Sequence, residues 1–68
     1  MSIEWVRKYY RVPAKRGGRV EYTGAGKPEL GTIWGAASGG HLSVHLDTAT
    51  HLMTFHPWKL RYLGEALS

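Results

Sequence analysis

Positively charged and aromatic side chains are interleaved near the start of the chain, and this mixture is typical of surfaces that bind nucleic acids. Lys and Arg neutralise phosphates, and aromatic rings stack on bases. The alternative is that the rings belong to a hydrophobic core and the cations only keep the surface soluble. The residues that we predict to contact nucleic acid, with Tyr9 as the stacking ring, are Arg7, Lys8, Tyr9, Arg11, Lys15, Arg16 and Arg19.

Histidines are the other side chains that could bind a metal or move a proton, and the chain has four: His41, His45, His51 and His56. If residues 42–46 and 51–55 form a hairpin, His41 lies across from His56. Two imidazoles fall short of the three protein ligands of a catalytic zinc site and the four of a structural one. We therefore expect no metal site. Protonation of both rings at about pH 6 would instead weaken the hairpin by repulsion.

Catalytic chemistry has little support in the sequence. No serine lies in a nucleophile-elbow sequence, and the spacing implies no pairing of a histidine with a carboxylate. The glycine-rich residues 23–27 lack the spacing of a phosphate-binding loop, and Pro28 stands where the following helix would begin. We therefore expect a non-enzymatic protein with no catalytic residues and no cofactor.

Length and composition limit the chain to one small domain, which we place at residues 1–68. It has 68 residues, of which 43% are hydrophobic, and no cysteine. The absence of cysteine excludes disulfides, thiolate nucleophiles and Cys-ligated zinc. No apolar run approaches the roughly 20 residues of a membrane span, and the charged start lacks the apolar centre of a signal peptide. We expect a soluble, cytoplasmic protein without a membrane partner.

The net charge of +4 is unevenly distributed along the chain. Residues 1–27 carry seven Lys and Arg against two Glu, whereas residues 28–68 carry two Lys and Arg against three Asp and Glu. An excess of positive charge favours anionic partners and does not bear on the fold. The charge therefore points to the N-terminal part of the chain as the binding region.

The N-terminal segment, residues 1–12, has the features of a short helix. Ser2 is a favourable N-cap, and Ile3, Val6 and Tyr10 fall on one helical face before Pro13 prevents continuation. We predict a helix of about two turns, with an extra strand as the alternative.

The remaining chain has the alternation and the glycine spacing of short strands, and we expect a barrel over residues 19–63. Residues 19–22, 31–36 and 42–46 are predicted strands. A hairpin loop at 47–50 would pair Leu46 with His51, Val44 with Met53 and Leu42 with Phe55. Pro57 then predicts one 3₁₀ turn before a last strand at 59–63. We expect Trp34 and Trp58 to lie in the core at a barrel end; the alternative is that they form a groove beside Pro57 and Tyr62 for a proline-rich peptide.

Five short strands with glycine-rich turns predict a mainly β fold, a five-stranded partly open barrel with a short N-terminal helix or extra strand. The segments RGGRVEYTG, GTIWG, HLSVHLD and HPWKLRYL resemble the SH3-like small β-barrels. The first two are also similar to KOW-type nucleic-acid-associated barrels and to type II dihydrofolate reductases. The opening YYRVPAKRG and the ending HPWKLRYL resemble short uncharacterised prophage-type proteins.

The reductase resemblance would imply a tetramer with a Val-Gln-Ile-Tyr motif that contacts the ligand. The corresponding stretch, residues 53–56, reads Met-Thr-Phe-His and lacks the Gln and the Tyr. We therefore expect a small binding module that takes nucleic acid or another anionic partner through the N-terminal basic segment. The alternative is a protein-interaction module or a homo-oligomeric structural subunit that uses an apolar patch near Leu52 and Trp58.

Overall fold

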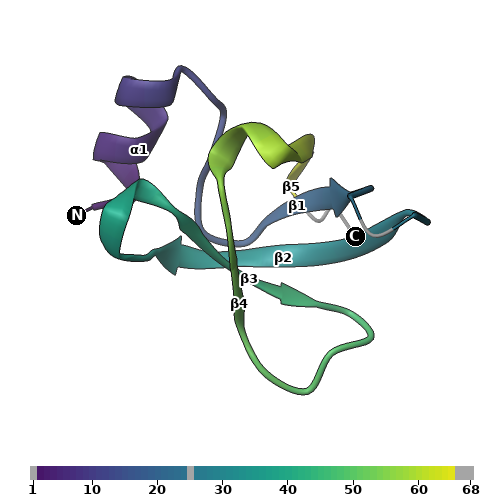
Figure 1. Ribbon diagram of the computed structural model, residues 1–68. Helices are drawn as coiled ribbons and strands as arrows, with labels where there is room; N and C mark the ends of the chain where they lie inside the picture. Colours follow the sequence, from purple (N-terminus) through teal and green to yellow (C-terminus); the bar gives the residue numbers. More distant parts are fainter. Residues whose placement is uncertain (1, 25, 66–68) are drawn as a thin grey trace.

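The computed structural model describes residues 2–24 and 26–65 and shows one antiparallel sheet of five strands with a short N-terminal helix (Figure 1). The strand order is β4-β3-β2-β1-β5. This arrangement confirms the predicted mainly β class and its partly open barrel. The elements in chain order are α1 (Ile3–Tyr10), β1 (Gly18–Tyr22), β2 (Glu29–Ala36), η1 (Ser38–Gly40), β3 (Leu42–Leu46), β4 (Met53–Phe55), η2 (Pro57–Lys59) and β5 (Leu60–Glu65), where η marks a 3₁₀ turn.

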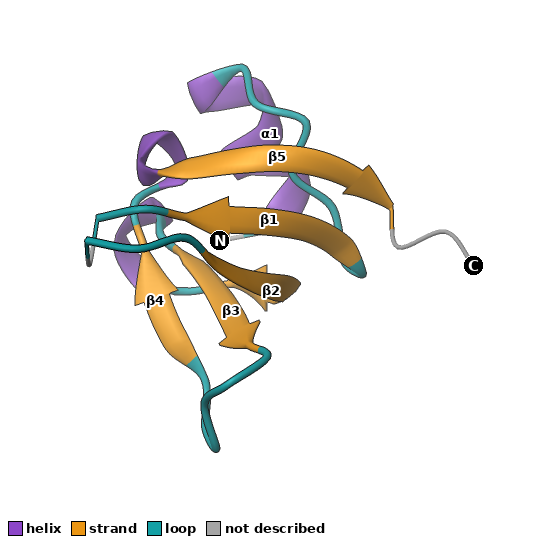
Figure 2. Cartoon of the chain, turned by 90° about the vertical axis from the view of Figure 1, so that its right-hand side faces the viewer, coloured by secondary structure: helices purple, strands orange, loops and turns teal. Residues whose placement is uncertain are grey.

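Strong bending of the sheet gives it a concave, apolar side. Figure 2 shows β1 and β5 running side by side while β3 and β4 bend away from them through β2. The register shifts once between β1 and β5 and once between β2 and β3. Such bulges bend a strand and increase its twist, so the sheet curls around the core.

Alternating residues of the strands fill that core, as the period of two in the sequence predicted. In β3 the side chains alternate between buried and half-buried along Leu42–Leu46. The helix adds two residues from one end, where it packs beside η2. The buried apolar residues are Ile3, Val6, Ala14, Val20, Ile33, Leu42, Val44, Leu46, Phe55 and Leu60.

The helix α1 confirms the predicted two turns and their cap. The Ser2 Oγ accepts a hydrogen bond from the Trp5 backbone N–H at 3.1 Å, as an N-cap residue does. Ile3 and Val6 are buried. The helix ends because Arg11 takes a left-handed conformation, with φ of 56°, and donates its N–H to the Arg7 carbonyl.

The register of the β3–β4 hairpin confirms two of the three predicted pairs. Leu42 lies opposite Phe55 and Val44 opposite Met53, whereas Leu46 is not paired with His51. The third pair was wrong because the chain turns immediately after β3: the Ala49 N–H bonds to the Leu46 carbonyl at 3.0 Å. The strand β4 therefore begins only at residue 53.

The last turn and strand follow the prediction with a shift of one residue. The turn η2 includes Lys59, so β5 begins at Leu60. The Tyr62 hydroxyl donates to the Pro57 carbonyl at 2.7 Å and ties β5 to the turn. Burial raises the pKa of Tyr62 to about 12.

The two tryptophans that we expected in the core are both on the surface, and this prediction was wrong. Trp34 is 58% exposed and Trp58 is 69% exposed. Trp34 follows Ile33, which faces the core, so the alternation of the strand places Trp34 on the outer side. Trp58 lies in η2, and its indole packs against Tyr10 at the end of α1 instead of entering the core.

No helix in the described ranges is long and apolar enough to span a membrane.

Candidate nucleic-acid interface

The folded chain distributes the seven predicted contact residues over different parts of the surface. Lys8, Tyr9 and Arg11 are exposed on α1 or just after it. Arg7 and Arg16 line one pocket. The Arg19 side chain is part of an ion pair on the outer side of β1, and Lys15 is half-buried in the loop that follows the helix. The basic segment is therefore not one continuous surface.

Around Tyr9 the structure assembles an aromatic surface, which we define as Trp5, Tyr9, Tyr10, His56 and Trp58. Trp5 and Tyr9 are four residues apart, so they are neighbours on the helix, and their rings stack with centroids 4.6 Å apart and an interplanar angle of 9°. Tyr10 meets the Trp58 ring edge-on at 5.4 Å. It meets His56 in the same manner at 5.0 Å. The helix and the turn thus form one aromatic array.

Hydrogen bonds hold the array in place before any ligand binds. The Trp58 Nε1–H donates to the Tyr10 carbonyl at 3.1 Å. The Trp58 backbone N–H donates to the His56 Nδ1, also at 3.1 Å. With both its backbone and its ring tied down, Trp58 loses little freedom when a ligand binds, which favours affinity.

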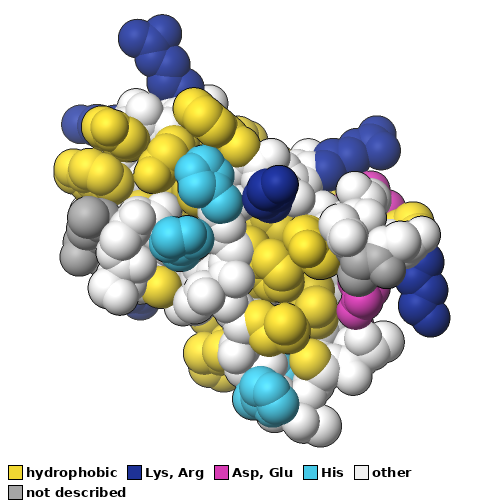
Figure 3. All heavy atoms as spheres, in the orientation of Figure 1, with side chains coloured by type: hydrophobic (Ala, Val, Ile, Leu, Met, Phe, Trp, Pro, Cys, Tyr) yellow, Lys and Arg dark blue, Asp and Glu magenta, His cyan; other side chains and the backbone are white. Residues whose placement is uncertain are grey.

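Much of this array faces solvent. Tyr9 is 66% exposed, and Trp5, beneath it in the stack, is 39% exposed. Figure 3 shows hydrophobic side chains gathered around two histidines over α1 and η2, with Lys and Arg side chains at the rim. A flat, exposed ring that is already oriented is a platform on which another planar ring can stack.

Three exposed cations flank the aromatic surface: Lys8, Arg11 and Lys59. Lys8 lies three residues after Trp5 and next to Tyr9, and Lys59 directly follows Trp58. Within the described part of the chain, none of the three forms an ion pair with a carboxylate. Their charges are therefore available to an external anion.

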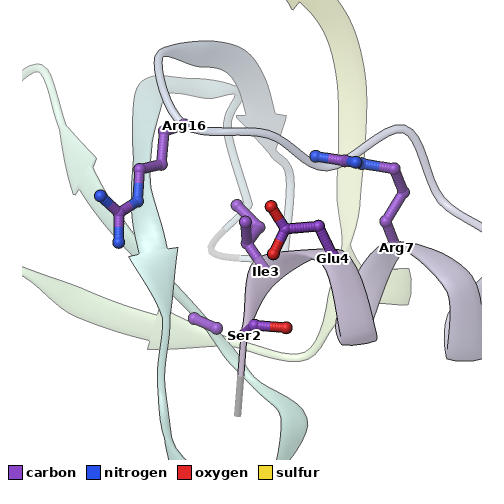
Figure 4. Close-up of a pocket in the computed structure, with 6 residues that line it drawn as sticks. Ser2, Ile3, Glu4, Arg7 and Arg16 are labelled. Atoms are coloured by element: carbon purple, nitrogen blue, oxygen red, sulfur yellow. The ribbon is translucent and has the colours of Figure 1, made fainter.

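Arg7 and Arg16 lie on the other flank of α1, in a pocket of about 480 Å³. Arg7 Nε donates to the Ala14 carbonyl at 2.7 Å, which fixes the guanidinium. Figure 4 shows the Glu4 side chain between the two arginines. Because this carboxylate offsets part of the positive charge, the pocket is a weaker anion site than two arginines alone would make.

The ion pair of Arg19 removes it from the candidate interface. Its Nη1 and Nη2 donate to the two carboxylate oxygens of Asp47 at 2.9 and 2.6 Å, and Nη1 also donates to the Thr32 Oγ1 at 2.7 Å. These hydrogen bonds raise the pKa of Arg19 and lower that of Asp47. A guanidinium that is bound by two oxygens of one carboxylate has few donors left for a phosphate.

The lowered pKa of Asp47 predicts a loss of stability in acid. A carboxyl whose folded pKa is below its unfolded value, about 3.9, stabilises the protein above that value, and the contribution disappears as the pH falls through the folded pKa. We expect Asp47→Asn to lower the melting temperature at pH 7, and we expect this difference to shrink as the pH falls below about 3.9. Thermal melts of both proteins across this range would measure it. The control is Glu29→Gln, because Glu29 has no ion pair among the described residues; a pH-independent difference for Asp47→Asn would contradict the prediction.

The histidines do not form one cluster. The rings of His41 and His56 lie 5.9 Å apart and nearly perpendicular, so the predicted proximity is present. His45 instead approaches Trp34, and the His51 Nδ1 lies 3.2 Å from the Thr50 Oγ1. Within residues 2–24 and 26–65, no three His, Asp or Glu side chains come close enough together to hold a metal ion.

The prediction from sequence did not include five residues of the candidate interface: Trp5, Tyr10, His56, Trp58 and Lys59. Trp5 could have been found, because it precedes Tyr9 by four residues in a predicted helix. Pro57 predicted that Trp58 lies in a turn, but no pattern in the neighbouring residues indicates that this turn packs against α1. The Trp58 Nε1 bond to Tyr10 joins residues 48 positions apart.

Comparisons of the chain with protein-family models, curated proteins and solved structures give no match. The proposals below therefore start from the geometry of these residues.

Proposed function

We propose that this protein is a non-enzymatic module that binds single-stranded nucleic acid on the aromatic surface of α1 and η2. The observation that carries the proposal is the pair of exposed, fixed rings, Tyr9 and Trp58, with cations beside each of them. Stacking platforms combined with positive charge are the common features of proteins that bind single strands without strong sequence preference.

Single strands suit this surface better than duplexes. In a duplex the base faces are covered by their neighbours, whereas unpaired bases can stack on an aromatic side chain. Each stacked base contributes about 1–3 kcal/mol to binding. Tyr9 and Trp58 come from different elements and are oriented separately, so two bases of one strand can be bound.

A protein partner is the competing function, because exposed tryptophans are also frequent anchors of protein interfaces. The apolar patch that the sequence suggested would combine Leu52 with Trp58, but the two flank β4 at opposite ends. We favour nucleic acid because Lys8, Arg11 and Lys59 carry only positive charge around the rings. A stable oligomer of the free protein in sedimentation experiments would support the competing function.

Fluorescence anisotropy with a labelled oligothymidylate tests the proposal. Each phosphate contact contributes about 0.7 to the slope of log K against log salt concentration for single strands. Contacts from Lys8, Arg11 and Lys59 give a slope of about −2, so affinity should fall roughly 20-fold between about 50 and 200 mM salt. The absence of binding at the lower concentration would overturn the proposal.

A further inference from the structure

A second exposed tryptophan lies on the outer side of the sheet, away from the surface described above. Trp34 is 58% exposed in the middle of β2, while Ile33 and Gly35 on either side of it are buried. The proposed function makes no use of this residue. A large ring left open to water in the centre of a strand calls for a physical reason.

The alternation of β2 supplies that reason. Burial alternates along Gly31, Thr32, Ile33 and Trp34, so Ile33 faces the core and Trp34 faces outward. In the register with β3, Ile33 pairs with Val44 and Gly35 with Ser43, which leaves Trp34 as the extra residue of a bulge. The indole is therefore turned outward by the backbone itself, and it does not depend on a neighbouring side chain for its exposure.

One side chain approaches this ring, and a second lies over the next residue of the strand. The His45 ring lies 6.1 Å from it at an angle of 44°. On the other side, Arg16 lies over Gly35: its Nε is 3.8 Å from the point where a Cβ of residue 35 would stand. Because glycine has no side chain, the guanidinium can approach the backbone directly beside Trp34.

Arg16 also connects this site to the helix, since it lines the pocket that contains Arg7 (Figure 4). Positive charge thus continues from the flank of α1 to the backbone of Gly35, the residue after Trp34, although Glu4 weakens it. A planar ring next to a guanidinium suits a ligand that carries both an aromatic face and a negative charge. An unpaired nucleobase with its phosphate has both.

We propose that Trp34, Arg16 and His45 form a second stacking site, which binds another base of the same single strand. This inference rests on the proposed function. The molecule is 28 Å across in its longest dimension. At roughly 3.4 Å per nucleotide along one strand, about 4 nucleotides span roughly 14 Å and reach one surface only, whereas about 12 nucleotides span roughly 41 Å and can contact both.

Trp34→Ala tests the second site with oligothymidylates of these two lengths. We expect the affinity for the longer strand to fall about 5- to 20-fold, at the lower end of the contribution of a stacked base. The affinity for the shorter strand should change less than about twofold, because Tyr9 and Trp58 dominate its binding. Trp34→Phe keeps a ring and should recover most of the loss, and Arg16→Gln should reduce the salt slope by about 0.7.

The outcomes separate the two proposals. If the wild-type protein binds neither strand, the proposed function fails, and the second site fails with it. If Trp58→Ala weakens binding of the longer strand and Trp34→Ala does not, only the second site is overturned. The indole N–H signals in NMR spectra of the wild-type protein give a check that needs no variant: the Trp34 signal should move with the longer strand, and an unmoved signal contradicts the second site.

Discussion

Replacing both Tyr9 and Trp58 by alanine is expected to reduce the affinity for an oligothymidylate of about 12 nucleotides by at least about 30-fold. Each ring contributes about 1–3 kcal/mol through a stacked base, so the two together contribute at least about 2 kcal/mol, and about 1.4 kcal/mol corresponds to a factor of ten. The two rings come from α1 and η2, and we expect each to stack on its own base, so their losses should add. Anisotropy titrations of the double variant and of both single variants would measure the effect.

The matched control for this experiment is Leu63→Ala. Leu63 is an exposed large hydrophobic residue like Tyr9 and Trp58, with 46% of its surface open, but it lies in β5 outside the aromatic surface. Its substitution should leave the affinity unchanged within about twofold. Equal losses in the control and the double variant would mean that binding is non-specific, and an unchanged double variant would contradict the proposed interface.

The largest effect on stability is expected for Leu42→Ala, which should lower the free energy of unfolding by about 2–5 kcal/mol. Leu42 is fully buried and lies between two paired neighbours, Ala36 in β2 and Phe55 in β4. A domain of this size has a total stability of roughly 3–10 kcal/mol. The substitution should therefore remove a large part of the total stability.

Urea unfolding followed by circular dichroism would measure this loss, and the chain offers the same substitution at an exposed position as a control. Leu52 is 43% exposed in the loop before β4. Leu52→Ala should change the unfolding free energy by no more than about 0.5 kcal/mol. If the two variants were equally stable, Leu42 would not be at the centre of the core.

The Tyr9 and Trp58 variants should differ in their effect on stability. Trp58 is fixed by its hydrogen bond to Tyr10, which also packs against the core. Loss of the exposed Tyr9 ring removes its contacts with Trp5 and Tyr10 but leaves this hydrogen bond in place, so its main effect should be on binding. Loss of Trp58 also removes a connection between η2 and α1, so this variant should show a small decrease in melting temperature in addition to its weaker binding.

The sequence by itself determined the local elements. The alternation of residues 42–46 predicted β3, and the spacing of Ile3 and Val6 between Ser2 and Pro13 predicted α1. These predictions succeed because the periods of 2 and 3.6 residues follow from backbone geometry and appear directly in the order of polar and apolar side chains. The hairpin register was predictable for the same reason, except at Leu46, where the turn begins one pair early.

Only the tertiary structure decided which side chains share a surface. It brought Trp58 to Tyr10 and separated Arg19 from the other cations by pairing it with Asp47. It also placed Ile33, and not its neighbour Trp34, in the core. These relations depend on contacts between residues far apart in the chain, which leave no periodic signal. The sequence therefore indicated that a basic and aromatic surface exists, and the packing of α1 against η2 determined which residues form it.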